Sequence, residues 1–244
     1  MCVLEGPDLV DAALESRAEF EAVYVDASAA QTTPLTQLTQ RAQQQGVRVF
    51  ALAEGVIEKI ADAQTPQPVL AAVRFEQRSV ESVAKAGLVL VLHDLKDPGN
   101  VGTIIRSADA TGATAVILTG QSVDPFNPKT LRASAGSIFH LPVVVASIED
   151  TLAYFGPDAQ LLATVVRGGR HFRDVDFSVA SVVVIGNEAD GLDAATIARC
   201  GQTISIPMHG RSESLNAGVA ASLIAFEALW QSRGAAVTPP PRSL

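Results

Sequence analysis

Hydrophobic and polar positions follow two rhythms along the chain, and the second rhythm begins near residue 88. From there, short continuous apolar runs alternate with longer stretches whose apolar residues recur at helical spacing. Continuous runs are typical of strands buried on both faces, so we expect a mostly parallel sheet with helices on each side. The expected strands are 88–93, 115–118, 161–166, 182–185 and 203–206.

The first 75 residues show a smaller alternating pattern. The expected helices are 5–16, 35–46 and 54–63, and the expected strands are 21–28, 47–53 and 68–75. Pro7 stands early in the first helix, where proline is tolerated, and Gly46 closes the second. Because no cluster of catalytic side chains occurs here, we interpret this unit as a small α/β binding or packing domain.

Two polar segments divide the chain. Residues 76–86 lie between two apolar strands and predict a linker, and the Pro-rich residues 234–244 predict a disordered tail. We therefore expect an α/β protein with a small domain over 1–75 and a larger domain over 87–233.

Composition narrows the class of protein. The chain has 244 residues, 48% of them hydrophobic, and its formal net charge is -8. This charge argues against coating nucleic acid by bulk attraction, but it leaves a local basic patch open. Two distant cysteines without metal spacing exclude a disulfide scaffold or a zinc ribbon in practice. No apolar run of about 18 residues and no signal peptide is visible, so we expect a cytoplasmic protein without a membrane span or a metal.

The stretch DPGNVGTIIRSADATG follows the first strand of the larger unit. We expect its helix to start near Asn100, with Asn100 as the cap and Arg106 on the face away from the sheet. Gly99 and Gly102 would let the backbone approach a ligand. A capped helix with a solvated arginine is the alternative. The expected buried face comprises Val101, Ile104, Ile105, Ala108 and Gly112.

Two later strands also end in loops with unusual polar residues. The stretch VVVIGNEADGL matches neither a dinucleotide fingerprint nor a phosphate-binding loop, and Glu188 indicates recognition of a cation, a hydroxyl or an amine. In ISIPMHGRSESLNAGVAAS, a turn leads to a long helix rich in small residues, with Asn216 in its first turn. Taken singly, each loop also fits an ordinary capping arrangement.

Together, in this order and spacing, the three stretches resemble the motifs of the SpoU-type (TrmH-type) RNA ribose methyltransferases of the SPOUT superfamily. The resemblance covers about residues 87–231, and the first 75 residues resemble the family's ribosomal-protein-like substrate-binding domain, without the leading helix that usually precedes it. The resemblance implies a parallel sheet with a deep trefoil knot. It also implies a homodimer in which the helix over 214–231 is part of the interface.

The same resemblance implies S-adenosylmethionine as cofactor and methyl transfer to a ribose 2′-hydroxyl of RNA. Ribosomal RNA, 23S in particular, is the first choice of substrate and transfer RNA the second. Asn100, Arg106, Glu188 and Asn216 would line the reaction centre, with Arg106 acting either as the base or as a stabiliser of the developing oxyanion. The implied cofactor contacts are Leu118, Thr119, Gly120, Gly186, Asn187, Ile206, Met208 and Leu215.

Several cations could form a local phosphate track beside such a site, although each alone also fits a solvated surface charge. The candidates are Arg74, Lys129, Arg132, Arg167, Arg170, Arg173 and Arg211.

Two small departures from the family pattern, Ala189 and the pair at 217–218, concern details of the pocket. One alternative function is that of a nicotinamide-dependent oxidoreductase, but the sequence lacks the glycine fingerprint that such an enzyme requires. A catalytically silent RNA-binding homologue is a second alternative, against which the presence of all four reaction-centre residues argues.

Overall fold

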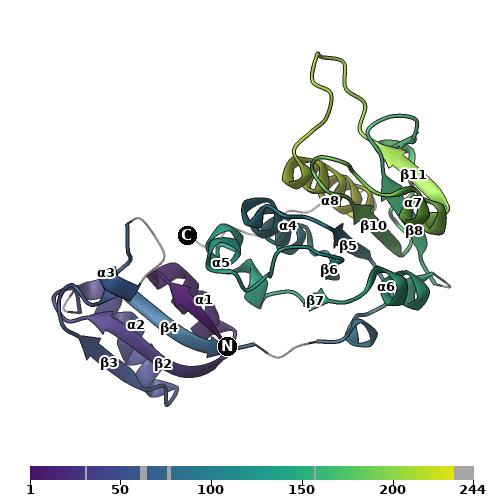
Figure 1. Cartoon of the computed structure of the whole chain (residues 1–244). Coiled ribbons are helices and arrows are strands. Elements are labelled where there is room, and N and C mark those ends of the chain that lie inside the picture. The colour runs from purple at the N-terminus through teal and green to yellow at the C-terminus, as the bar shows by residue number, and fades with distance from the viewer. Residues whose placement is uncertain (31, 61–64, 76–77, 157, 234–244) are drawn as a thin grey trace.

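The computed structural model describes residues 1–30, 32–60, 65–75, 78–156 and 158–233. In this part of the chain, two sheets are formed by successive segments, with the N-terminal unit beside the larger one (Figure 1). The predicted tail over 234–244 lies outside the described residues.

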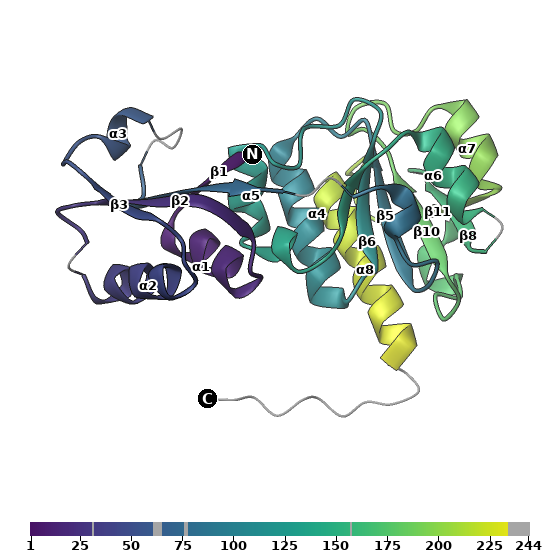
Figure 2. The ribbon, with the colours of Figure 1, turned by 90° about the horizontal axis from the view of Figure 1, so that it is seen from below.

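The N-terminal unit is a four-stranded sheet with the order β1-β4-β2-β3. Strand β4 is antiparallel to β1 and β2, while β2 and β3 run parallel. Helices α1 and α2 lie on one face of this sheet (Figure 2). The elements are β1 (Cys2–Glu5), α1 (Pro7–Glu15), β2 (Glu19–Asp26), α2 (Thr33–Gln44), β3 (Val49–Leu52), α3 (Ile57–Ile60) and β4 (Val69–Arg74).

Every helix and strand predicted for this unit is found, with shifted ends. The expected helix over 54–63 is shorter, because α3 spans Ile57–Ile60 and residues 61–63 lie outside the described part. Strand β1 was not predicted, since four residues are too few to show a period.

The larger unit is a seven-stranded sheet with the order β7-β6-β5-β10-β8-β11-β9. Each pair of neighbouring strands in it is parallel, as predicted. The short strands β7 and β9 at its two edges were not predicted. Its elements are β5 (Leu88–His93), α4 (Pro98–Thr111), β6 (Ala115–Thr119), α5 (Pro128–Ser134), β7 (Val143–Val145), α6 (Ile148–Phe155), β8 (Gln160–Thr164), β9 (Arg170–His171), β10 (Ser181–Ile185), α7 (Ala194–Cys200), β11 (Gln202–Ser205) and α8 (Ala217–Arg233).

Alternate residues of β5 face two different cores. Leu90 and Leu92 pack in the core that includes Ile104 of α4 and Ile224 of α8, whereas Val91 packs in the core that includes α6. All six residues of β5 are buried. The prediction of a sheet covered on both faces is therefore confirmed, and its physical cause is visible in this strand.

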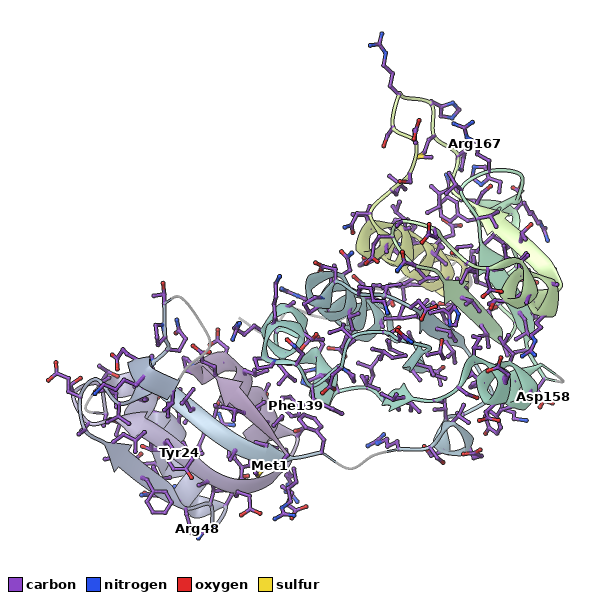
Figure 3. All side chains as sticks on the ribbon, viewed as in Figure 1. Met1, Tyr24, Arg48, Phe139, Asp158 and Arg167 are labelled. Atoms are coloured by element: carbon purple, nitrogen blue, oxygen red, sulfur yellow. The ribbon has the colours of Figure 1, made fainter. Side chains whose placement is uncertain are left out.

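The two units are packed against each other. The carboxylate of Glu5, whose side chain is 5% exposed, lies 3.1 Å from Nη1 of Arg132. The ring of Phe75 lies 4.3 Å from that of Phe126 and 5.2 Å from that of Phe139, measured between centroids. Figure 3 shows Phe139 at this boundary. The N-terminal unit is thus held by both an ion pair and an aromatic cluster.

The segment predicted as a linker contributes to the second core. It contains the short 3-10 helix η1 (Val80–Ser82), and Val80 and Val83 are buried there. None of the helices in the described residues is long and apolar enough to cross a membrane.

Candidate active site

Helix α4 begins two residues earlier than predicted, at Pro98. Its cap is Asp97, whose Oδ1 accepts the backbone N–H of Asn100 at 2.8 Å. The prediction that Asn100 is the cap is therefore wrong, because the Asp-Pro pair before it supplies both a capping carboxylate and a proline suited to the first turn. The side chain of Asn100 is consequently available for another partner.

The predicted buried face of α4 is confirmed at four positions and wrong at the fifth. Gly112 is exposed and ends the helix in the left-handed region, at φ 69°. Glycine suits that terminal position because it has no Cβ to strain. The four confirmed positions are Val101, Ile104, Ile105 and Ala108.

The two glycines of this turn serve packing within the protein. A Cβ on Gly102 would lie 2.4 Å from the Cβ of Ala133 in α5, and a Cβ on Gly99 would lie 2.8 Å from Oδ1 of Asp97. Cβ atoms do not come this close to other heavy atoms. Close helix packing and the cap are therefore sufficient to explain both glycines, and the expected approach of a ligand stays a prediction.

Three of the four predicted reaction-centre residues form one hydrogen-bonded chain. Nδ2 of Asn216 donates to Oδ1 of Asn100 at 2.8 Å, and Nδ2 of Asn100 donates to Oε1 of Glu188 at 2.8 Å. Asn100 lies in the first turn of α4, Glu188 in the loop after β10 and Asn216 just before α8, so they come from segments far apart in the sequence. The structure thus brings together Asn100, Glu188 and Asn216, as the combination of motifs predicted.

The orientation of both amides follows from the two ends of this chain. A carboxylate can only accept, so Asn100 must turn its N–H toward Glu188. At the other end, Oδ1 of Asn216 accepts the backbone N–H of Val219 at 3.1 Å, so its N–H faces Asn100. Asn216 therefore precedes α8 and caps it, and it does not lie inside the first turn as we expected.

Arg106 lies on the exposed face of α4, between one and two turns after Asn100. It forms no ion pair and no side-chain hydrogen bond with any residue that the structure describes. The neighbouring Ser107 is instead engaged, since its hydroxyl lies 2.7 Å from that of Ser222 in α8. Helices α4 and α8 are thus joined next to the exposed Arg106.

The loop after β10 has a tight turn that only glycine permits. A Cβ on Gly186 would lie 2.4 Å from the carbonyl carbon of Gly191. Asn187 holds the loop twice: its Oδ1 accepts the N–H of Ala189 at 2.8 Å, and its Nδ2 donates to the carbonyl of Asp94 at 2.8 Å. The loop that carries Glu188 is therefore tied to the end of β5.

A cavity of about 290 Å³ opens at the carboxyl ends of β8, β10 and β11. The sequence analysis did not identify the wall at the end of β8, formed by Thr164, Val165 and Val166. It predicted these residues as part of the strand 161–166, whereas β8 ends at Thr164, so the strand end at which a ligand could bind was placed two residues too late. Five of the eight predicted cofactor contacts line the cavity: Gly186, Asn187, Ile206, Met208 and Leu215.

The other three predicted contacts, Leu118, Thr119 and Gly120, do not line this cavity. They border a second one, of about 810 Å³, together with Phe75 and other residues near the boundary of the two units. Oγ1 of Thr119 lies 2.9 Å from Nδ1 of His93, and a Cβ on Gly120 would lie 2.5 Å from Oδ1 of Asp94. The turn after β6 is thus engaged by the end of β5.

Most of the predicted RNA-facing cations have partners inside the protein. Arg132 is paired with Glu5, as described above, and Arg173 Nε lies 3.3 Å from Oε2 of Glu227. Arg170 donates to the carbonyl of Asp174, and Arg74 is paired with Glu19 and Glu21.

Three of the cations have neither an ion pair nor a side-chain hydrogen bond among the described residues, and all three are exposed: Lys129, Arg167 and Arg211. Arg167 lies beside the projecting segment between β11 and α8, which contains Arg211 (Figure 3). The predicted cations therefore do not form one continuous track. Those without a described partner at this end of the larger unit are Arg167 and Arg211.

Known proteins resemble this chain over both of its units. The family model described as "SpoU rRNA Methylase family" matches residues 87–226, and the one described as "MRM3-like substrate binding domain" matches residues 1–71. The 23S rRNA (guanosine(2553)-2'-O)-methyltransferase RlmP of Bacillus subtilis (strain 168) is 32% identical over 227 residues, which are 92% of this chain and 86% of that protein.

A second relative and a solved structure come from Streptomyces viridochromogenes. The 23S rRNA (uridine(2479)-2'-O)-methyltransferase is 36% identical over 202 residues, 78% of this chain and 70% of that protein. The crystal structure of the SpoU methyltransferase AviRb in complex with the cofactor AdoMet is similar with a TM-score of 0.85 at 29% identity, covering 94% of this chain and 89% of that one.

Proposed function

Because the chain belongs to the SpoU rRNA methylase family, we propose that it transfers a methyl group from S-adenosylmethionine to a ribose 2′-hydroxyl of 23S ribosomal RNA. The observation that carries the proposal is the Asn216–Asn100–Glu188 chain, whose last member also lines the 290 Å³ cavity. A polar arrangement built from three distant segments beside a cavity suits a transfer reaction between two bound molecules.

The cavity fits the proposed cofactor. Its volume is near the lower end of the range of roughly 300–1,000 Å³ for small-molecule pockets. Aliphatic side chains such as Ile204, Ile206 and Ile224 would offer an apolar wall to an adenine ring. When bound, S-adenosylmethionine supplies a methyl group activated by its sulfonium.

The protein's own residues would position the ribose and manage its proton. We propose that Asn100, Asn216 and Glu188 orient the sugar through their hydrogen-bonded chain. Arg106 would grip the adjacent phosphate and stabilise the oxyanion that develops as the 2′-hydroxyl loses its proton. A guanidinium is a poor base because it stays protonated in proteins, so we favour this role over proton abstraction.

Recognition of RNA would involve both units. Arg167 and Arg211 are exposed next to segments that line the cavity, and Lys129 is exposed on α5, the helix that contacts β1 of the N-terminal unit. We propose residues 1–75 as a substrate-binding domain that resembles a ribosomal protein, and residues 87–233 as the methyltransferase domain. Because binding through these cations would release counterions, RNA affinity should fall as salt is raised.

A homodimer with a trefoil knot completes the proposal. Four apolar side chains are exposed along and just before α8, namely Leu215, Val219, Leu223 and Trp230, the last at 60%. Such a row is typical of a helix that packs on a partner. Size-exclusion chromatography with light scattering should report a dimer for the wild type and a monomer for Leu223→Glu. The knot is proposed from the resemblance to the SpoU-type family alone.

The proposed function is tested by transfer of isotope-labelled methyl groups. The wild type should label 23S rRNA, with the label at ribose 2′-oxygens, and should label transfer RNA less. Arg106→Ala should lower the rate by about 10²–10³-fold. A wild type that binds S-adenosylmethionine but methylates no RNA would favour the catalytically silent homologue instead.

Arg106→Lys separates the two roles of this residue. If the lysine variant restored part of the rate at every pH, the charge-stabilising role would be supported. The role as a base would be supported instead if Arg106→Lys restored no activity and the pH–rate profile of the wild type contained an ionisation that Arg106→Ala removes.

A further inference from the structure

The sheet of the N-terminal unit has a helix-covered face and a second face, called here the open face. Val23 of β2 belongs to the core that also contains residues of α1 and α2, and Val49 of β3 packs against it. Because side chains alternate along a strand, Tyr24 and Phe50 point to the open face. Figure 2 shows α1 and α2 on one side of this sheet and α3 on the other.

Tyr24 and Phe50 form a stacked pair on the open face. They are neighbours in the parallel pairing of β2 with β3. Their ring centroids lie 5.7 Å apart, and the angle between their planes is 22°. Tyr24 is half-buried, whereas Phe50 is 45% exposed. A stacked pair whose outer ring is exposed offers a surface on which a further planar group can stack.

The outer side of Phe50 is open because β3 is the edge strand of its sheet. The strand order β1-β4-β2-β3 places Tyr24 on one side of Phe50 and no strand on the other. A planar group that arrives at this edge would therefore continue the stack that Tyr24 and Phe50 begin.

A guanidinium stands beside the open ring. Arg48 lies two positions before Phe50, and its carbonyl accepts the N–H of Val23, so its side chain points to the same face. This side chain is 68% exposed. Its Nη2 donates to the carbonyl of Glu21 at 3.2 Å and lies 3.6 Å from Oε2 of Glu21, a carboxylate that Arg74 engages more closely. Nε and Nη1 of Arg48 have no partner among the described residues, so they can donate to an anion.

Stacked rings beside a guanidinium match one nucleotide of a single-stranded RNA. An unpaired base presents a planar face for stacking, and its phosphate accepts hydrogen bonds from a guanidinium. Bases inside a duplex are already stacked on both faces, so a duplex does not offer this contact. Four-stranded sheets that bind RNA through aromatic rings on one face are an established mode of recognition.

The open face and the reaction centre point to the same side of the molecule. In Figure 2, the C-terminal end of α8 points to the side on which α1 and α2 lie, so its beginning, next to Asn216, points to the side of α3. Figure 3 shows Tyr24 and Arg48 on the part of the N-terminal unit that is remote from Phe139 at the boundary. One long RNA can therefore extend from the reaction centre to the open face.

We propose that the Tyr24–Phe50 pair is a stacking site for an unpaired base of the RNA substrate, with the guanidinium of Arg48 on the neighbouring phosphate. The inference rests on the proposed function, because it takes RNA as the substrate. It adds the surface through which the N-terminal unit binds RNA and the form of RNA that this surface selects, a single strand.

Stacking should supply most of the affinity at this face. Arg48 and Arg74 carry two positive charges there, and Glu19 and Glu21 carry two negative ones, so the four charges cancel. Loss of Phe50 should therefore weaken binding equally at every salt concentration. Loss of a phosphate contact from an unpaired cation would instead reduce the slope of log affinity against log salt.

The experiment measures binding of the full chain to a fluorescein-labelled single-stranded RNA of about 12 nucleotides by fluorescence anisotropy, with a duplex of the same sequence for comparison. Phe50→Ala should weaken binding to the single strand by about 5- to 100-fold, the range for one stacked base, and leave duplex binding nearly unchanged. Its salt slope should equal that of the wild type. Phe50→Tyr keeps a ring and should retain the affinity.

Val3 offers a matched control on the same face. It lies on β1 at the opposite edge of the sheet, is 51% exposed and has no ring. Val3→Ala should bind the single strand as tightly as the wild type. Light scattering should give the same mass for the wild type and Phe50→Ala. A smaller mass for the variant would make a second copy of the chain the occupant of the open face and overturn the proposal.

Two further measurements do not depend on binding by a variant alone. In the wild type, 4-thiouridine placed in the single strand should crosslink on irradiation to a peptide that contains Tyr24 or Phe50, as identified by mass spectrometry. In steady-state kinetics, Phe50→Ala should raise the KM for RNA more than it lowers kcat, because the pair lies away from the reaction centre. A purely structural phenylalanine would lower the melting temperature without this split.

Either of two results would overturn the inference. One is a Phe50→Ala variant that binds the single strand as the wild type does, and the other is a set of crosslinks confined to residues 87–233. Methyl transfer to RNA by the wild type would leave the proposed function standing in both cases. A wild type that neither binds nor methylates RNA would contradict the proposed function itself, so the two failures are distinguishable.

Discussion

The turns after β10 and β6 are alike in sequence and different in use. Both follow a fully buried strand, and both contain a glycine beside a polar residue, Gly186 with Asn187 and Thr119 with Gly120. Both are hydrogen-bonded to the end of β5, but the first turn lines the 290 Å³ cavity and the second borders the 810 Å³ cavity near the boundary of the two units. The comparison teaches that similar turns at strand ends face different cavities, according to the place of each strand in the sheet order.

The strand order explains this difference. From β5 the chain first moves outward through β6 to β7, and then returns to place β10 on the other side of β5. Ligand sites in parallel sheets form where the direction of strand order changes, because adjacent loops diverge there. Gly186 follows β10, on the side of β5 where the strand order changes direction, and Gly120 follows β6 on the other side.

Substitutions at Gly186 and Gly120 should give the largest difference in cofactor affinity. Gly186→Ala places a Cβ 2.4 Å from backbone of Gly191, so the loop must move, and we expect cofactor affinity to fall by at least about 10²-fold. Gly120→Ala meets a side chain, Oδ1 of Asp94, at φ 64°, and should cost about 1–3 kcal/mol of stability. Isothermal titration calorimetry measures the cofactor affinity of each variant, and thermal unfolding measures its stability. Equal losses of affinity would contradict the assignment of the two turns.

Asn100 and Asn127 allow a similar contrast between two asparagines. Asn100→Ala breaks the chain to Glu188, and we expect kcat to fall by about 10²-fold or more. Asn127 caps α5 through the backbone N–H of Lys129, at 2.9 Å. Asn127→Ala should lower stability by about 1 kcal/mol and leave kcat nearly unchanged. The assignment fails if Asn100→Ala behaves like the cap variant.

Two arginines should separate structure from RNA recognition. Arg132→Ala leaves the buried carboxylate of Glu5 without its partner, so we expect a stability loss of about 1–3 kcal/mol. Arg167→Ala should leave the melting temperature unchanged, weaken RNA binding and reduce the slope of log affinity against log salt by about 1. Filter binding at several salt concentrations measures this slope. An Arg167 variant with wild-type salt dependence would remove it from the RNA interface.

The smallest expected effect is an acid sensitivity at the start of α7. The pKa of Asp193 is lowered by its hydrogen bonds to Thr196, so its stabilising contribution is complete above the ordinary aspartate pKa and is lost as pH falls through the lowered one. Asp193→Asn should therefore show a shallower loss of melting temperature between about pH 5 and pH 3. Identical acid slopes in the two proteins would contradict this linkage.

Patterns within short windows were reliable where burial alone decides the structure. Four of five positions on the buried face of α4 were predicted, because helical spacing and hydrophobicity coincide there. The same reasoning misplaced the cap at Asn100, since it weighed the asparagine and overlooked the Asp97-Pro98 pair. It also missed β7 and β9, since strands of three and two residues carry no measurable period.

The sequence by itself determined the parallel α/β class and the three polar stretches at strand ends, because strand burial is a local property. The reaction-centre residues came from the resemblance to the family and stay a prediction. Only the tertiary structure decided which strand ends meet. It joined Asn216, Asn100 and Glu188 and kept Thr119 and Gly120 out of the 290 Å³ cavity. The physical reason is that hydrogen bonds between distant loops depend on strand order, and strand order is not encoded in any single window of residues.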